Sequence, residues 1–213
     1  MAMLAKEFKK EKTDGSELIG WIQSEKFDGY RALFFYDKDN NPQFISRTGK
    51  KFNAPEHFLN SMPSHKCLKG RILDGELWAG RENFQLMGTV RKKIPIPEEW
   101  FEIKFMAYDI TNLDKTFTER LVELNKIVKI TKEKWDIILK KKIDYPFNNL
   151  DCPIEFTEQI KIKSIKMMDE YYQKILKSGG EGIMIKYPES HIYHYNHYEV
   201  TSLKRLSIKY DDM

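Results

Sequence analysis

Three mainly apolar segments of this chain each carry an acidic residue followed directly by glycine. They are SEKFDGYRA at residues 24–32, LDGELW at residues 73–78 and EGIMIK at residues 181–186. Short apolar runs of this kind are typical of β-strands. A glycine inside a strand marks a bulge or a close approach of the backbone to another group. We therefore expect several strands that bring lysines, carboxylates and glycines together at a shared groove.

The remaining segments indicate an α+β fold with mainly antiparallel sheets. Residues 20–36 predict a hairpin in which an Asp-Gly turn joins two strands. Further strands are expected at residues 43–52, 71–80, 100–110 and 181–187. Helices are expected at residues 53–63, 116–128 and 157–180. The elements do not alternate strictly, as a parallel α/β fold would require. No linker divides residues 1–213, which we take as one domain.

The composition argues against a membrane protein and leaves a nucleic-acid partner open. The 213 residues carry a formal net charge of +4 and contain no apolar run near the roughly 20 residues of a membrane-spanning helix. The N-terminus lacks the apolar core of a signal peptide. Two cysteines, Cys67 and Cys152, lie far apart and outside any metal-binding spacing. We expect an intracellular, non-membrane protein whose mild positive charge permits a nucleic acid as partner.

The charged residues beside the three glycines suggest a phosphate and a divalent metal as ligands. A lysine binds phosphate as a point charge, and carboxylates supply part of the oxygen shell of magnesium. Neither a P-loop nor a dinucleotide-binding glycine pattern occurs. Each charged group alone also fits an ordinary solvent-facing strand, and Lys26 also fits the end of a hairpin. The three groups together favour a nucleotide groove.

EKFDGYR, at residues 25–31, resembles the first motif, KxDGxR, of the covalent nucleotidyltransferases. These are the ATP-dependent DNA ligases, the RNA ligases and the mRNA-capping guanylyltransferases. Further segments follow in the family's order: SRTGK, LDGELW, FMAYDI and EGIMIK. The opening MLAKEF resembles the lead-in of small bacterial and viral ATP-dependent DNA ligases. The resemblance implies the adenylation domain of such a ligase: two mainly antiparallel sheets with flanking helices around a nucleotide groove.

The resemblance implies roles for the residues of the first, third and fourth motifs. Lys26 would attack the α-phosphate of ATP and carry AMP, which requires an uncharged amine. Arg31 would contact the ribose and phosphate, and Glu76 would hydrogen-bond the ribose. Glu25 would bind adenine through its backbone, and Glu181 would help to hold Mg²⁺.

The resemblance also implies an adenine site and a contact with nicked double-stranded DNA. Tyr108 would stack on adenine, and Met184 or Ile183 would cover the other face of the base. Arg47, in SRTGK, would bind the 5′-phosphate of the nick, which an arginine can hold through two hydrogen bonds. Such a ligase would act as a monomer.

The C-terminal segment departs from the family pattern. The family usually has two lysines separated by one residue, whereas SLKRLSIKYDDM contains Lys204 and Lys209 with Arg205 between them. Either lysine could contact the α-phosphate, and Lys204 matches the strand lead-in better. The chain ends at Met213, where related ligases continue into an OB-fold domain. We therefore expect an OB-fold domain in the full-length protein, and slow self-adenylation without it.

Other members of the superfamily are weaker alternatives. A guanylyltransferase usually has Asp-Gly rather than Glu-Gly in the fourth motif and leaves SRTGK unexplained. RNA ligases commonly lack the arginine of the first motif. An NAD-dependent ligase needs an additional upstream domain, for which the residues before Lys26 are too few. A fragment that binds nicked DNA but is inactive without its OB domain is an alternative of a different class.

Overall fold

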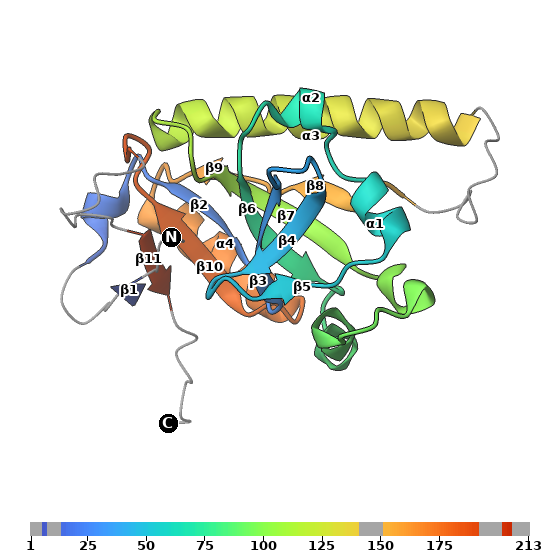
Figure 1. Ribbon diagram of the computed structural model, residues 1–213. Coiled ribbons are helices and arrows are strands. Elements are labelled where there is room, and N and C mark those ends of the chain that lie inside the picture. The colour runs from blue at the N-terminus through green and yellow to red at the C-terminus, as the bar shows by residue number, and fades with distance from the viewer. Residues whose placement is uncertain (1–5, 8–13, 141–150, 192–201, 206–213) are drawn as a thin grey trace.

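The protein is an α+β structure built on two β-sheets, as the sequence predicts. Figure 1 shows the computed structural model, which describes residues 6–7, 14–140, 151–191 and 202–205. A five-stranded sheet has the order β1-β11-β10-β2-β9, and a six-stranded sheet has the order β5-β4-β3-β6-β7-β8. Only the pairs β1–β11 and β7–β8 are parallel, so both sheets are mainly antiparallel within the described residues.

The elements follow one another along the chain in a mixed order. The strands are β1 (Lys6–Glu7), β2 (Ile22–Lys26), β3 (Tyr30–Tyr36), β4 (Pro42–Ser46), β5 (Lys51–Phe52), β6 (Leu73–Trp78), β7 (Lys104–Ile110), β8 (Ile154–Phe156), β9 (Ile160–Lys161), β10 (Gly182–Lys186) and β11 (Ser202–Arg205). The α-helices are α1 (Glu56–Asn60), α2 (His65–Leu68), α3 (Phe117–Lys140) and α4 (Ile165–Lys177). Short 3₁₀ helices are η2 (Ser16–Leu18), η3 (Phe84–Arg91) and η4 (Pro97–Trp100).

The hairpin predicted at residues 20–36 is wrong. β2 pairs with β10 and β9 in one sheet, whereas β3 pairs with β4 and β6 in the other. The turn between them contains Gly29, where a Cβ atom would lie 2.3 Å from the carbonyl oxygen of Leu77. This close approach is possible only for glycine. The Asp-Gly turn therefore carries the chain from one sheet to the other and leaves Lys26 and Arg31 on different sheets.

Each sheet packs mainly against one helix, although Phe117 and Leu121 at the start of α3 also cluster with Ile22 of the five-stranded sheet. The six-stranded sheet contributes to a large core that contains Phe34, Phe44, Phe105 and Trp100, and α3 lies along this side of the molecule (Figure 1). A second cluster joins α4 to Ile183 and Ile185 of β10 in the five-stranded sheet. Because Ile183 and Ile185 face α4, Met184 and Lys26, which alternate with them in the register, lie on the other face of the five-stranded sheet.

Two predicted helices have different boundaries in the structure. α3 continues well past residue 128, because Thr131 and Trp135 extend its buried stripe. α4 begins only after Ser164, whose hydroxyl accepts a hydrogen bond from the backbone N–H of Met167 at 3.2 Å. The segment before this N-cap forms β9 instead of helix, since its edge position beside β2 satisfies the backbone.

Two further observations concern the described residues alone. No helix among them has the length and apolarity that crossing a membrane would require. Cys67 and Cys152 are both free thiols.

Candidate active site

Lys26 and Glu181 form an ion pair where β2 ends and β10 begins. Lys26 is the Cα partner of Gly182, so the residue before Gly182 is brought beside the lysine. The Lys26 Nζ atom contacts a carboxylate oxygen of Glu181. The side chains are 18% and 36% exposed, respectively. The pairing of the two strands thus joins the lysine of the first motif to the carboxylate of the fourth.

Arg31 is fixed by Asp74 through two hydrogen bonds. The Nε atom donates to Oδ1 at 2.9 Å, and an NH2 group donates to Oδ2 at 2.5 Å. Asp74 is only 4% exposed, and β3–β6 pairing makes Glu76 the Cα partner of Arg31. Such a two-point contact holds the guanidinium in one orientation. Arg31 and Glu76, predicted to act on the same nucleotide, therefore lie side by side.

Tyr108 lies at a β-bulge. Asp74 pairs with Asp109 while the next residue, Gly75, pairs with Ala107, so Tyr108 is the extra residue of β7. A Cβ at Gly75 would lie 2.5 Å from the ring of Phe105, so glycine is required here. Bulges occur next to active sites because they re-aim one side chain. Asp74 and Gly75 of the third motif thus lie opposite the bulge that contains Tyr108.

Two cations lie over the ring of Tyr108. The guanidinium carbon of Arg31 is 5.9 Å from the ring centroid, and the Nζ atom of Lys186 is 4.9 Å from it. Burial and the nearby Asp74 raise the pKa of the Tyr108 hydroxyl well above its ordinary value. The tyrosine is therefore a neutral aromatic ring with two cations over it and the carboxylate of Asp74 nearby.

Glu76 is held in a setting that favours its protonated form. Burial raises the pKa of its carboxyl from 4.5 to about 8, with Asp74 and Asp28 adding to the shift and Arg31 and Lys26 opposing it. A protonated carboxyl can donate a hydrogen bond as well as accept one. At neutral pH, Glu76 can therefore serve both the donors and the acceptors of a sugar hydroxyl.

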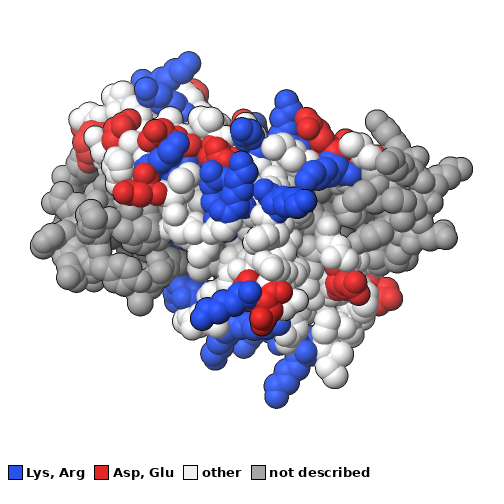
Figure 2. Space-filling model, turned by 45° about the horizontal axis from the view of Figure 1, so that its top comes forward, with Lys and Arg blue, Asp and Glu red and all other residues white. Residues whose placement is uncertain are grey.

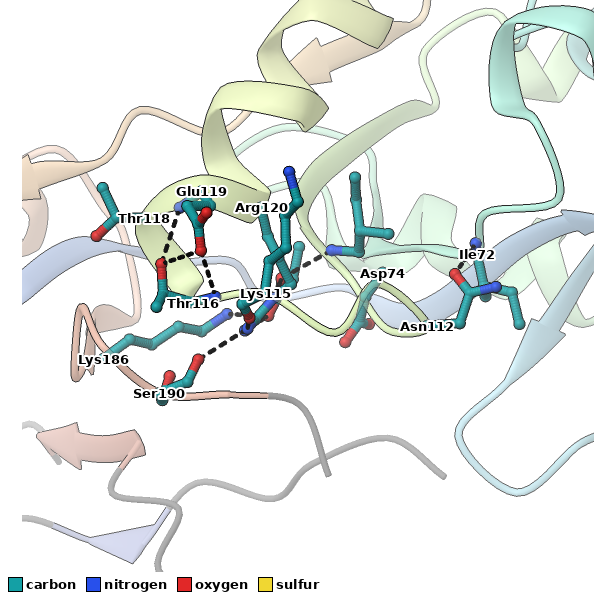
Figure 3. A network of polar contacts seen from close by, with 12 residues as sticks. Ile72, Asp74, Asn112, Lys115, Thr116, Thr118, Glu119, Arg120, Lys186 and Ser190 are labelled. Atoms are coloured by element: carbon teal, nitrogen blue, oxygen red, sulfur yellow. Dashed lines mark hydrogen bonds and ion pairs between the residues drawn. The ribbon is translucent and has the colours of Figure 1, made fainter. Parts of the chain in front are cut away.

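A buried ionic cluster around Asp109, the residue after Tyr108, links the two sheets, and Figure 3 shows its members Arg120 and Lys186. Arg120 of α3 is fully buried and donates to both carboxylate oxygens of Asp109, at 2.7 and 3.1 Å. Lys186 of β10 lies 3.6 Å from the same carboxylate, and burial lowers its pKa while Asp109 opposes that shift. Asp109 of the six-stranded sheet thus pairs with Arg120 of α3 and with Lys186 of the five-stranded sheet.

Arg120 also holds the chain that follows β10. One of its nitrogens donates to the carbonyl oxygens of Lys115 and Ser190, at 2.7 and 2.8 Å. Thr118 donates from its backbone N–H to the carbonyl oxygen of Pro188 at 3.1 Å. Sequence reasoning missed Arg120, because one arginine in an amphipathic helix has the same pattern as a solvated one. It placed Lys186 among the charged residues expected near a phosphate and a metal, but it did not predict the contacts of Lys186 with Asp109 and Tyr108.

A cavity of about 330 Å³ opens beside Lys26. Its lining includes Asp28, Glu181 and the loop after β6. In that loop Arg81 donates to both carboxylate oxygens of Glu25, at 3.2 and 2.7 Å, a contact that the sequence did not signal. Asp28 and Glu181, which line this cavity with Lys26, could hold a divalent cation together with phosphate oxygens. No group of three or more metal-ligating side chains occurs among the described residues.

The strand register decides which residue of β10 faces the groove. Met184 pairs with Ser24, two residues before Lys26 on the same face of β2. Ile183 is fully buried in the cluster beneath α4, so of the two predicted covers for adenine only Met184 remains. Lys204 of β11 is the Cα partner of Met184. Lys209 lies outside the described residues.

Arg47 directly follows Ser46, which is the Cα partner of Ala32, the residue after Arg31. It is exposed in the turn between β4 and β5. On the face seen in Figure 2, lysines and arginines are interspersed with acidic residues. Charge alone therefore does not mark a nucleic-acid surface on this face, and the DNA contact of Arg47 stays a prediction.

Most of the chain matches a known protein family. A model described as the ATP dependent DNA ligase domain matches residues 2–204. The chain belongs to this family. As a member of the ATP-dependent DNA ligase domain family, it is 24% identical over 171 residues to a DNA ligase of Haemophilus influenzae, covering 80% of this chain and 53% of that relative. It is 25% identical over 180 residues to DNA ligase 2 of Methanosarcina mazei, covering 78% of this chain and 29% of the relative.

Solved structures of DNA ligases share the fold of this domain. A Lig E DNA ligase, described as DNA binding with a minimal scaffold, has a TM-score of 0.68 and 23% identity, covering 95% of this chain and 68% of the other. The Chlorella virus DNA ligase-adenylate has a TM-score of 0.58 and 17% identity, covering 94% of this chain and 66% of the other. The ligase domain described here thus spans about half, or less, of the curated relatives that it matches.

Proposed function

We propose that this chain is the adenylation domain of an ATP-dependent DNA ligase and that Lys26 is the residue that carries AMP. One observation carries the proposal: five side chains expected to act on the nucleotide lie along one groove. They are Lys26, Glu181, Arg31, Glu76 and Tyr108. They come from both sheets, and the family match over residues 2–204 supports their common purpose. The 213 residues would form one domain.

In the first step the Lys26 Nζ atom attacks the α-phosphorus of ATP. A nitrogen–phosphorus bond forms, the bond from the α-phosphorus to the bridging oxygen breaks, and pyrophosphate leaves. The lysine must lose a proton before it attacks, and its ion pair with Glu181 must open. Arg31, already oriented by Asp74, would bind the ribose and phosphate side, and Lys204 or Lys209 would bind the α-phosphate.

Magnesium fits the carboxylates beside Lys26. Mg²⁺ is usually bound by one or two carboxylates together with phosphate oxygens and water. Glu181 would be the protein ligand, and Asp28 lines the same cavity. When bound, the ion supplies neutralisation of the phosphate charge. The residues of the chain provide the rest: orientation by Arg31, the sugar contact by Glu76, and the base site between Tyr108 and Met184.

In the later steps AMP passes to nicked double-stranded DNA. The 5′-phosphate attacks the phosphorus of lysyl-AMP, which releases Lys26; the 3′-hydroxyl then attacks the activated 5′-phosphate, which releases AMP and seals the strand. Arg47 would bind the 5′-phosphate through its two-point fork. A C-terminal OB-fold domain would complete the grip on DNA in a full-length, monomeric, intracellular protein.

The transferred nucleotide tests this proposal. The chain is incubated with magnesium and with ATP, GTP or NAD labelled in the phosphate that would be retained, and then with nicked DNA. We expect label on the protein from ATP only, followed by its passage to the 5′-phosphate of the nick. Label from GTP would indicate an RNA-capping enzyme instead, and transfer to nicked RNA but not DNA would indicate an RNA ligase.

A further inference from the structure

The short connection between β8 and β9 joins the two sheets beside the groove. β8 is the edge strand of the six-stranded sheet, and β9 is the edge strand of the five-stranded sheet. At one end of the connection, the backbone N–H of Thr157 donates to the carbonyl oxygen of Ala107 at 2.8 Å. At the other end, Ile160 pairs with Gln23 of β2. Residues 157–159 therefore run from beside β7, which contains Tyr108, to beside β2, which contains Lys26.

Two polar groups of this connection are buried and lack a partner among the described residues. They are the hydroxyl oxygen of Thr157 and the amide nitrogen of Gln159. Thr157 is only 2% exposed. Buried polar side chains in native proteins are nearly always hydrogen-bonded, so each exception calls for an explanation, such as an ordered water or a ligand that completes the hydrogen bond. The hydroxyl can donate or accept, whereas the amide nitrogen can only donate.

The strand registers place these two groups level with the residues predicted to cover adenine. Ala107 pairs with Phe156, so Thr157 lies beside Tyr108. Gln23 pairs with Ile160, so the residue before Ile160 falls opposite Ser24, which in turn pairs with Met184. Thr157 is thus level with Tyr108 and Gln159 is level with Met184, the two residues predicted to cover the faces of the base.

We propose that Thr157 and Gln159 recognise the edge of the adenine base, an inference that rests on the proposed function. Adenine presents ring nitrogens as acceptors and an exocyclic amine as donor, whereas guanine presents an acceptor where adenine has the amine. Gln159 donates to a ring nitrogen of adenine, and Thr157 accepts from the amine. A site built for these bonds rejects a base that leaves its buried groups unpaired.

Gln23 provides a matched control. Both polar atoms of its amide are also buried without a partner among the described residues, but it pairs with Ile185, which belongs to the cluster beneath α4. Gln23 therefore faces away from the groove. Replacing it by leucine removes a buried amide on the opposite face of the sheet from the predicted base site.

The test compares Gln159→Leu, Thr157→Val and Gln23→Leu in this chain. Single-turnover transfer of AMP from ATP and of GMP from GTP gives the half-saturating nucleotide concentration and the limiting rate. We expect Gln159→Leu and Thr157→Val to raise the half-saturating ATP concentration by about tenfold or more, with a smaller change in the limiting rate and a smaller preference for ATP over GTP. Gln23→Leu should behave as the unaltered chain, and Thr157→Ser, which keeps the hydroxyl, should lose less of the preference for ATP than Thr157→Val.

Equilibrium binding of AMP and GMP, measured by calorimetry, separates this inference from the proposed catalysis. Selective binding of AMP that weakens in Gln159→Leu and Thr157→Val supports the inference even if no covalent transfer occurs. Unchanged binding and unchanged ATP preference in both variants, with normal melting temperatures, would overturn it while leaving the ligase proposal intact. Failure of the unaltered chain to prefer AMP over GMP would also overturn it.

Discussion

Replacing Arg120 by methionine should destabilise the domain strongly, because it leaves a buried carboxylate without its main partner. Arg120 is 0% exposed and Asp109 is 3% exposed. After the change, Asp109 keeps the backbone N–H of Ile110 at 2.7 Å and the more distant Lys186. Removing one partner of a buried ion pair typically costs about 3–5 kcal/mol. For a domain of this size we expect the melting temperature to fall by about 6–20 °C.

The assay is urea and thermal unfolding followed by circular dichroism. Lys166→Met is the control, because its pair with Glu170 is 85% and 65% exposed and should contribute less than about 1 kcal/mol. The double variant Arg120→Met/Asp109→Asn should lose less stability than the sum of the two single variants, since it no longer buries an unpaired charge. A loss below about 1 kcal/mol for Arg120→Met alone would refute the reasoning.

Three further changes test other parts of the account. Burial raises the folded-state pKa of Glu76 to about 8, against an ordinary 4.5, so this carboxyl ionises at lower pH in the unfolded chain. The free energy of unfolding should therefore fall as pH rises from about 5 to about 8. Glu76→Gln should flatten this fall in denaturant titrations. Gln23→Leu should raise the free energy of unfolding by about 1–2 kcal/mol, because it removes two unpartnered buried atoms; an equal or lower value contradicts this. Gly29→Ala, whose Cβ would meet Leu77, should cost about 1–3 kcal/mol, whereas Gly88→Ala, with nothing within 4 Å, should cost almost nothing.

Much of the fold follows from local sequence patterns. The strands near residues 43–52, 71–80, 100–110 and 181–187 form as expected because each combines apolar alternation with turn residues at its ends. The pairing of residues 20–36 does not follow from these patterns. An Asp-Gly turn fits a hairpin equally well, and only the pairing of β2 with β10 and of β3 with β6 reveals the crossing.

Sequence motifs predicted the groove residues but not the residues that contact them. Lys26, Glu76 and Tyr108 stand in ordered segments, so their convergence could be expected from the resemblance. Arg120 and Arg81 have no such signal, because a buried arginine and a solvated one look alike in a single sequence. Their roles emerge only when the fold brings Asp109 and Glu25 within hydrogen-bonding distance.

The preference for Met184 over Ile183 likewise required the strand register. Adjacent residues of a strand point to opposite faces, and the sequence does not say which face meets α4. The pairing of Met184 with Ser24 and the burial of Ile183 beneath the helix decide between them.

Intact-mass spectrometry of this chain after incubation with Mg-ATP is the most direct test of the central claim. The account predicts a mass gain of one AMP, roughly 330 Da, as expected for a covalent lysyl intermediate. The gain should vanish in Lys26→Ala, which should melt like the unaltered chain, and should be absent when GTP replaces ATP. A covalent adenylate that persists in Lys26→Ala would contradict the account.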